Sequence, residues 1–188
     1  MPSQKFPFIA HLPYHVYNRG FEKQQIFFCE KDYLRFFAGT DIYLTEYPSV
    51  QLYAFCLLPN HFHFILAAAT EEDREGFMRK IQQSYAMYLK AKYRDDIPRG
   101  QVFEGRYHAR PMEDENYLSR CFTYVSYNAI KHELVTDIID WPWTSLHQIL
   151  ALPTDRPEIP RMHYLEGANI VDYVDINEES PIESGLLQ

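Results

Sequence analysis

The segment VQLYAFCLLPNHFHFILA (residues 50–67) decides the fold of this 188-residue chain. Its first half, residues 50–58, is rich in the aliphatic and aromatic side chains that β-strands favour. Pro59 and Asn60 then form a turn signal, and residues 61–67 resume the apolar run. The segment therefore predicts a β-hairpin.

Strand-like and helix-like segments alternate on both sides of this hairpin. The sequence predicts strands over 14–20 and near 106–112, and helices over 30–46, 71–93, 114–132 and from Trp141 to about Leu150. We expect an α+β fold with a ferredoxin-like β-α-β-β-α-β antiparallel sheet and an added C-terminal helix. In this plan the helices cover one face of the sheet, and the other face is free to bind a ligand.

Composition indicates one folded domain with an acidic extension. The chain is 46% hydrophobic and 16% aromatic, which is typical of a globular core. Residues 151–188 hold eight acidic and two basic side chains, so we expect a domain over 1–150 followed by an acidic, proline-containing arm. The net charge of −8 argues against simple coating of nucleic acid, which depends on basic surfaces.

The three cysteines, Cys29, Cys56 and Cys121, are odd in number and none lies in a C-x-x-C spacing. This pattern disfavours a disulfide framework or a thiolate zinc site and favours a reducing, cytoplasmic setting. No long apolar run follows the N-terminus, and the longest apolar stretch is too short to cross a bilayer. We therefore expect a cytoplasmic protein with no membrane partner.

His61 and His63 are the first candidate site residues. Side chains alternate along a strand, so the two histidines share one face while Phe62, Phe64 and Leu66 occupy the other. Two imidazoles this close on one strand can bind the same metal ion. The H-x-H pattern alone is also that of two surface histidines on a sheet.

The predicted helix over 114–132 carries the second candidate. Leu118, Cys121, Phe122, Val125 and Ala129 cluster on the core side of this helix. Tyr124 and Asn128 are four residues apart and therefore neighbours on one flank of that side, together with Lys131, whereas Tyr127 points towards solvent. A tyrosine hydroxyl is a poor nucleophile until it is activated, and a metal ion that polarises a phosphate supplies such activation. A boundary tyrosine that merely packs is the alternative interpretation.

Basic side chains lie where a nucleic acid could contact them. Arg19 shares a strand face with His15 and Tyr17, and Arg106 and Arg110 flank the last predicted strand. Arginines bind phosphates and aromatic rings stack on unpaired bases. Each of these residues is also compatible with an ordinary surface charge.

Together these motifs resemble the Y1 HUH transposases of the IS200/IS605 type, and most closely the REP-associated tyrosine transposases. The resemblance rests on YHVYNRG (14–20), FCLLPNHFHFIL (55–66), MRKIQQSYAMYLKAKY (78–93), GQVFEGRYHARPMEDENYLSRCFTYVSYNAIKHELV (100–135) and WPWTSLHQIL (141–150). The most specific part is P-N-H-x-H followed by Y-x-x-x-N on a helix.

The resemblance implies a metal-dependent single-stranded DNA endonuclease and strand transferase that acts in transposition and recombination. Tyr124 would be the catalytic nucleophile that forms a 5′-phosphotyrosine, and His61, His63 and Asn128 would bind Mg²⁺ or Mn²⁺. The partners would be single-stranded DNA hairpins or palindromic repeats, contacted by Arg19, Arg106, Arg110 and Lys131. Relatives act as homodimers or monomers, and the resemblance leaves this choice open.

The sequence departs from the family pattern after Asn128, where Ala129 and Lys131 replace a proline and an arginine. This difference motivates an alternative: a domesticated module that binds hairpin nucleic acid without cutting it. A third hypothesis is a metal-dependent phosphate-ester hydrolase that uses His61, His63 and His15 without a covalent intermediate.

Overall fold

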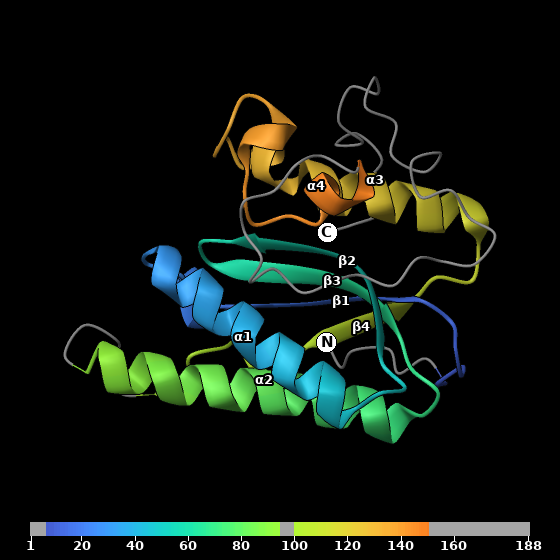
Figure 1. Cartoon of the computed structure of the whole chain (residues 1–188), viewed down its shortest axis with the longest axis horizontal. Coiled ribbons are helices and arrows are strands. Elements are labelled where there is room, and N and C mark those ends of the chain that lie inside the picture. Colours follow the sequence, from blue (N-terminus) through green and yellow to red (C-terminus); the bar gives the residue numbers. More distant parts are fainter. Residues whose placement is uncertain (1–6, 95–99, 151–188) are drawn as a thin grey trace.

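The computed structural model describes residues 7–94 and 100–150 and shows an antiparallel four-stranded sheet with helices on both sides (Figure 1). The elements in chain order are β1 (Tyr14–Arg19), the 3₁₀ turn η1 (Phe21–Lys23), α1 (Glu30–Glu46), β2 (Gln51–Leu58), β3 (His61–Ala67), α2 (Glu71–Lys92), β4 (His108–Pro111), α3 (Glu115–Lys131), the 3₁₀ turn η2 (Ile138–Asp140) and α4 (Leu146–Ile149). The predicted α+β class and the β-α-β-β-α-β order with an added helix are confirmed. The predicted arm over 151–188 lies outside the described residues.

The strands are ordered β2-β3-β1-β4, so the predicted hairpin pairs with β1 rather than standing alone. β1 runs antiparallel to β3, with Tyr17 opposite His63 and Arg19 opposite His61. On its other edge β1 pairs with β4, with His15 opposite Arg110. The register therefore brings alternate residues of three strands onto one face of the sheet.

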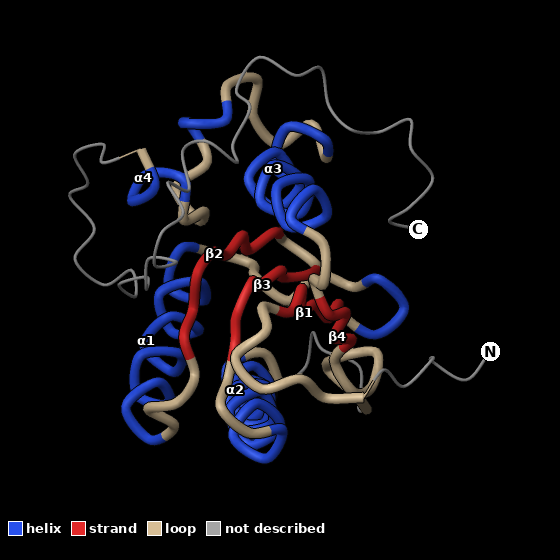
Figure 2. Tube along the Cα trace, turned by 90° about the vertical axis from the view of Figure 1, so that its right-hand side faces the viewer, coloured by secondary structure: helices blue, strands red, loops and turns tan. Residues whose placement is uncertain are grey.

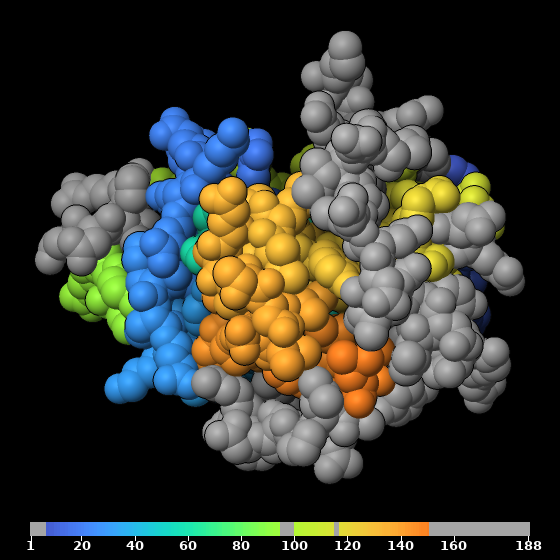
Figure 3. All heavy atoms as spheres, turned by 90° about the horizontal axis from the view of Figure 1, so that it is seen from above, coloured from blue at the N-terminus to red at the C-terminus, as the bar shows by residue number. Residues whose placement is uncertain are grey.

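The expectation that one face of the sheet is free was wrong. Helices α1 and α2 lie against one face, and α3 and α4 lie against the other (Figures 1 and 2). In Figure 3 the atoms of residues near 120–150, coloured yellow to orange, cover much of this second face. The physical reason is in the hairpin itself, because nearly every side chain of β2 and β3 is apolar and both faces must be shielded from water.

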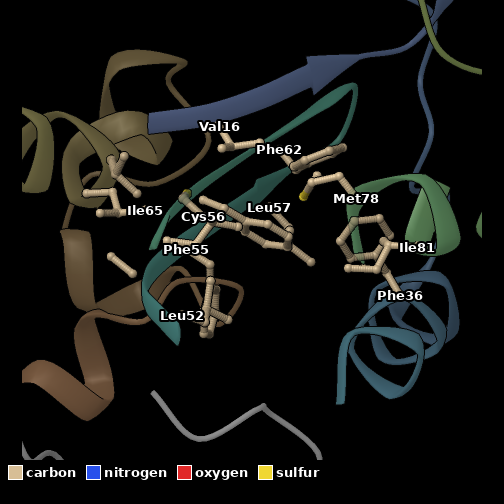
Figure 4. Close-up of a cluster of buried hydrophobic side chains, with 14 of the residues drawn as sticks. Val16, Phe36, Leu52, Phe55, Cys56, Leu57, Phe62, Ile65, Met78 and Ile81 are labelled. Carbon is tan, nitrogen blue, oxygen red and sulfur yellow. The ribbon is translucent and has the colours of Figure 1, made fainter. Parts of the chain in front are cut away.

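The core confirms which way the β3 side chains point. Phe62 and Phe64 pack against Phe36 of α1, with ring centroids 5.3 and 6.1 Å apart. Met78 and Ile81 of α2 are buried with them, and Figure 4 shows Phe62, Phe36, Met78 and Ile81 gathered on the α1 and α2 side of the sheet. The phenylalanines therefore face α1 and α2, and the histidines of the same strand face α3.

The chain after α3 returns to the outer edge of β2 and closes it. Leu57 N–H donates to the Trp143 carbonyl and Ser145 N–H donates to the Phe55 carbonyl, each at 2.9 Å. Thr144 forms a bridge to Cys56, so the predicted helix from Trp141 begins only at Leu146. This pairing removes an exposed strand edge and holds the end of α3 over the sheet.

A buried carboxylate joins the start of α1 to the end of α2. Asp32 is fully buried and accepts hydrogen bonds from the N–H groups of Phe28 and Cys29. It also accepts from the Tyr88 and Tyr93 hydroxyls, both at 2.8 Å, and from Lys92 Nζ at 2.6 Å. Burial raises the pKa of this carboxyl, but the hydrogen bonds from Lys92 and the two tyrosines lower it below its ordinary value.

We predict that Asp32→Asn lowers the free energy of unfolding by about 2–3 kcal/mol, because it removes charge-assisted hydrogen bonds from a buried site. The lowered pKa means that the wild-type contribution is complete above the ordinary aspartate value near 4 and is lost as the pH falls through the folded-state value. Denaturant unfolding from pH 7 to pH 3 measures both effects. Asp41→Asn, on the exposed side of α1, is the matched control, and equal losses in the two variants would contradict the assignment.

Candidate active site

A pocket of about 410 Å³ lies where β1, β3 and β4 meet the end of α3. Its lining contains four histidines, two tyrosines, two asparagines and three cationic side chains. These residues are His15, Tyr17, Asn18, Arg19, Lys23, Asn60, His61, His63, Arg110, Tyr124 and His132. The strand register explains this convergence, because His15, Tyr17 and Arg19 alternate onto the same face as His61 and His63. Among the described residues no helix is long and apolar enough to span a bilayer.

His63 is held by a second buried histidine. Its Nδ1 lies 2.9 Å from Nε2 of His15 in hydrogen-bond geometry. Burial lowers the pKa of His15 to about 4, aided by Arg110, and burial followed by the neighbouring His15 holds the pKa of His63 well below its usual value. Both imidazoles are therefore neutral near pH 7. When His63 Nδ1–H donates to His15, His63 Nε2 presents a lone pair.

His63 Nε2 is buried and has no hydrogen-bond partner among the described residues. His61 offers a second nitrogen of the same kind. Its Nδ1 lies 2.6 Å from Oδ1 of Asn60, whose amide Nδ2 donates to the Lys23 carbonyl. Because an amide oxygen only accepts, His61 Nδ1 carries the proton and its Nε2 carries the lone pair. The two rings are 5.0 Å apart, and the pKa of His61 is lowered to about 3, first by burial and then by His132.

Helix α3 brings Tyr124 against these histidines. The Tyr124 ring centroid is 5.5 Å from His63 and 6.0 Å from His15, in edge-on contact with both. Lys131 Nζ lies 4.8 Å from the centre of the same ring. Burial raises the pKa of the Tyr124 phenol, and the Asn128 carboxamide one helical turn away acts in the opposite direction.

Asn128 is an unsatisfied polar residue. Its side chain is fully buried, and neither Oδ1 nor Nδ2 has a hydrogen-bond partner among the described residues. Buried amides are normally paired, so an unpaired one calls for an explanation such as a bound ion. Tyr124 and Asn128 thus approach each other without reaching hydrogen-bond geometry.

These features fit a divalent cation. The available donors are two neutral imidazole nitrogens and one amide oxygen, which suit Mn²⁺ and, with water or phosphate oxygens added, Mg²⁺. Among the described residues no three His, Cys, Asp or Glu side chains are grouped to bind a metal. A metal site formed by His61 and His63 therefore requires the Asn128 oxygen or ligands from a substrate.

The four basic residues predicted to bind DNA fall in two places. Arg110 and Arg19 line the pocket and Lys131 lies over Tyr124, although Arg19 is also paired with Glu104. Arg106 is not part of this pocket. It precedes the short strand β4 and forms a 2.7 Å ion pair with Glu75 of α2.

The sequence did not predict the positions of two pocket residues in full. His132 is absent from the site residues predicted from the sequence, but its ring is 4.9 Å from His61 because α3 ends above that strand. His15 was considered only as a possible metal ligand, and the structure shows it buried behind His63. Alternation along β1 placed His15 on the correct face, whereas no local signal located His132.

The pocket defines a tyrosine–histidine site on an antiparallel sheet, and comparison with known proteins identifies the family. Residues 9–128 match the family model "Transposase IS200 like", which covers well over half of the chain. The chain therefore belongs to the IS200-like transposase family, and the resemblance drawn from the sequence is confirmed.

Individual proteins that are similar to this chain include the following two. One is a Haemophilus influenzae protein provisionally named a REP-associated tyrosine transposase, 24% identical over 128 residues that cover 62% of this chain and 70% of that protein. The other is a solved structure of a REP-associated tyrosine transposase bound to a REP hairpin. It has a TM-score of 0.67 and 17% identity, and the match covers 87% of this chain and 100% of the other, which shows a shared fold.

We predict that His15→Phe weakens Mn²⁺ binding by about 10- to 100-fold, the usual cost of losing a group that orients a metal ligand. Phenylalanine fills the same buried space but cannot accept the proton of His63 Nδ1, so the His63 tautomer is no longer fixed. Titration calorimetry with Mn²⁺ measures the affinity. His147→Phe on α4, outside the pocket, should bind as the wild type does, and unchanged affinity in both variants would rule out the orienting role.

Proposed function

We propose that this protein is a metal-dependent endonuclease and strand transferase for single-stranded DNA, cutting at hairpin or repetitive palindromic DNA through a 5′-phosphotyrosine intermediate. The observation that carries the proposal is the contact of Tyr124 with His63, beside the unsatisfied carboxamide of Asn128. Membership of the IS200-like transposase family supports it.

The residues of the pocket suit an in-line displacement at phosphorus. Tyr124 Oη forms a bond to the phosphorus as the bond to the 3′ oxygen breaks, so the 5′ phosphate remains on the tyrosine. The phenolic proton is balanced by the proton that the departing 3′ hydroxyl gains. Since the phosphotyrosine keeps an ester bond, a 3′ hydroxyl can reverse the step and rejoin DNA without ATP.

The Tyr124 phenol must be activated as a nucleophile because burial raises its pKa. Lys131, with Nζ 4.8 Å from the ring centre, stabilises negative charge that develops on Tyr124. Bound Mg²⁺ or Mn²⁺, held by His61, His63 and Asn128, would polarise the scissile phosphate. Arg110 and Arg19 at the pocket then orient the phosphates on either side of the break.

The DNA partner is inferred from the shared fold as well as from the chemistry of the pocket. The solved structure with the same fold is of a transposase bound to a REP hairpin, which supports hairpin DNA as the substrate class here. We place the reaction in the cytoplasm, in keeping with three cysteines that are all free thiols. The proposal covers a homodimer and a monomer alike.

We predict that Tyr124→Phe abolishes the covalent adduct between the protein and DNA while hairpin binding is kept, because only the nucleophilic oxygen is removed. The measurement is a denaturing gel of protein incubated with a labelled hairpin oligodeoxynucleotide and Mn²⁺. Tyr127→Phe removes the next phenolic hydroxyl along α3, which lies outside the pocket, and this variant should form adduct as the wild type does.

Three outcomes of this experiment would reject the proposal. An equal adduct in Tyr124→Phe and the wild type would remove Tyr124 from the reaction. Hairpin binding that survives chelation, with no nicking by the wild type, would favour the module that binds without cutting. Metal-dependent cleavage that persists in Tyr124→Phe would favour hydrolysis without a covalent intermediate.

A further inference from the structure

A second and larger depression, of about 770 Å³, lies between α2 and the segment 100–107. We call it the α2 groove. Arg79, Gln83, Ala86 and Lys90 lie along one stripe of the helix and form one wall. Residues 75 to 90 of a helix extend about 22 Å at 1.5 Å per residue, so the wall is long enough for several nucleotides of an extended strand.

The groove concentrates positive charge in an acidic protein. Among the described residues its lining contains Arg79, Lys90 and Arg106 but one carboxylate, Glu75, while the chain as a whole carries a net charge of −8. Glu75 is paired with Arg106. Arg79 and Lys90 are exposed and form no ion pair with a described residue, so both ammonium and guanidinium groups can bind phosphates.

The opposite wall is open to a close approach by a ligand. Gly105 has a φ of +123°, a conformation that other residues rarely adopt, and a Cβ atom placed there would meet nothing within 4 Å. The amides of Gln83 and Gln101 add hydrogen-bonding groups without a charge. This wall combines glycines with the aromatic residues Phe103 and Tyr107, and it faces cations and amides, a combination that suits a nucleic-acid strand of any sequence.

The groove adjoins the Tyr124 pocket. Asn18 borders the pocket, and its amide donates to the Gln82 side chain and, at 3.0 Å, to the carbonyl of Gly105, both of which line the groove. The ion pair of Arg19 with Glu104 lies beside this junction. A strand whose phosphate lies at Tyr124 can therefore continue past Asn18 into the groove.

We propose that the α2 groove binds the sugar–phosphate backbone of the single-stranded DNA that flanks the cleaved position. This inference rests on the proposed function in one respect, that single-stranded DNA occupies the Tyr124 pocket. It adds a second binding site on the opposite side of the sheet, formed by Arg79, Lys90 and the wall at Gly105. The site is expected to be tolerant of sequence, because its contacts are made to phosphates.

The test compares two double variants of equal net charge. Arg79→Ala/Lys90→Ala removes the cations of the groove, and Lys31→Ala/Lys80→Ala removes two other cations of α1 and α2 that do not line it. Fluorescence anisotropy with EDTA over a salt series measures binding of two probes, a hairpin oligodeoxynucleotide with a mixed-sequence single-stranded flank and the same hairpin without the flank.

For the flanked probe, the slope of log affinity against log salt should become shallower in the groove variant by roughly 1.4, because each lost phosphate contact on a single strand contributes about 0.7. The control variant should keep the wild-type slope, and the blunt hairpin should bind equally to all three proteins. Equal slopes of the two variants on the flanked probe would overturn the proposal that the α2 groove binds DNA.

The proposed function can fail separately from the groove. Suppose that the wild type forms no adduct through Tyr124, but that its salt slope on the flanked probe is steeper than that of the groove variant. The proposed enzyme activity is then rejected, and the proposed DNA binding by the groove is retained. If the adduct forms normally and the slope does not change, the groove is rejected and the enzyme stands. A wild type that forms no adduct with Mn²⁺ and binds neither probe at low salt rejects both.

Discussion

The structure depends on one constraint, that β3 is buried on both faces while its side chains alternate strictly. Phe62 and Phe64 fill the space under α1, so His61 and His63 must face α3. Because β3 is paired with β2 on one edge and β1 on the other, its register cannot slip without breaking two ladders. A slip of one residue would place imidazoles in the core and phenylalanines in the pocket. The core packing therefore fixes the site.

Covering the second face of the sheet creates the site and shields its polar groups from water. The return of residues 143–145 to β2 holds α3 over the strands, which buries His15, His63 and Asn128. Burial keeps the imidazoles neutral and raises the pKa of the Tyr124 phenol. Unpaired polar atoms of His63 and Asn128 thus lie beside a phenol that is not ionised. In the proposed mechanism, a cation that binds together with a phosphate would use these atoms as ligands and favour ionisation of the phenol.

The local features of this protein could be predicted from its sequence, and the long-range ones could not. Periodicity and turn residues located the hairpin over 50–67 and the helices, since these signals lie within a few residues of each other. The pairing of His15 with His63 and of His61 with His132 joins residues far apart in the chain. The covered second face was missed because the apolar side of α3 does not reveal which surface it packs against. Arg106 precedes β4, as predicted, but it lines the α2 groove and not the Tyr124 pocket, a difference that depends on long-range packing.

In the proposed arrangement of pocket and α2 groove, the acidic charge of the chain would contribute to selectivity for single-stranded DNA. Eight acidic and two basic residues in 151–188 account for most of the net charge of −8, so residues 1–150 are nearly neutral and the binding of nucleic acid would depend on the few places where cations gather. Arg110, Lys131 and Arg19 gather at the pocket, and Arg79 and Lys90 gather in the α2 groove. A duplex too stiff to turn around the edge of the sheet would reach only one of these regions. A flexible single strand can reach both at once, and the second contact then forms at a high effective concentration.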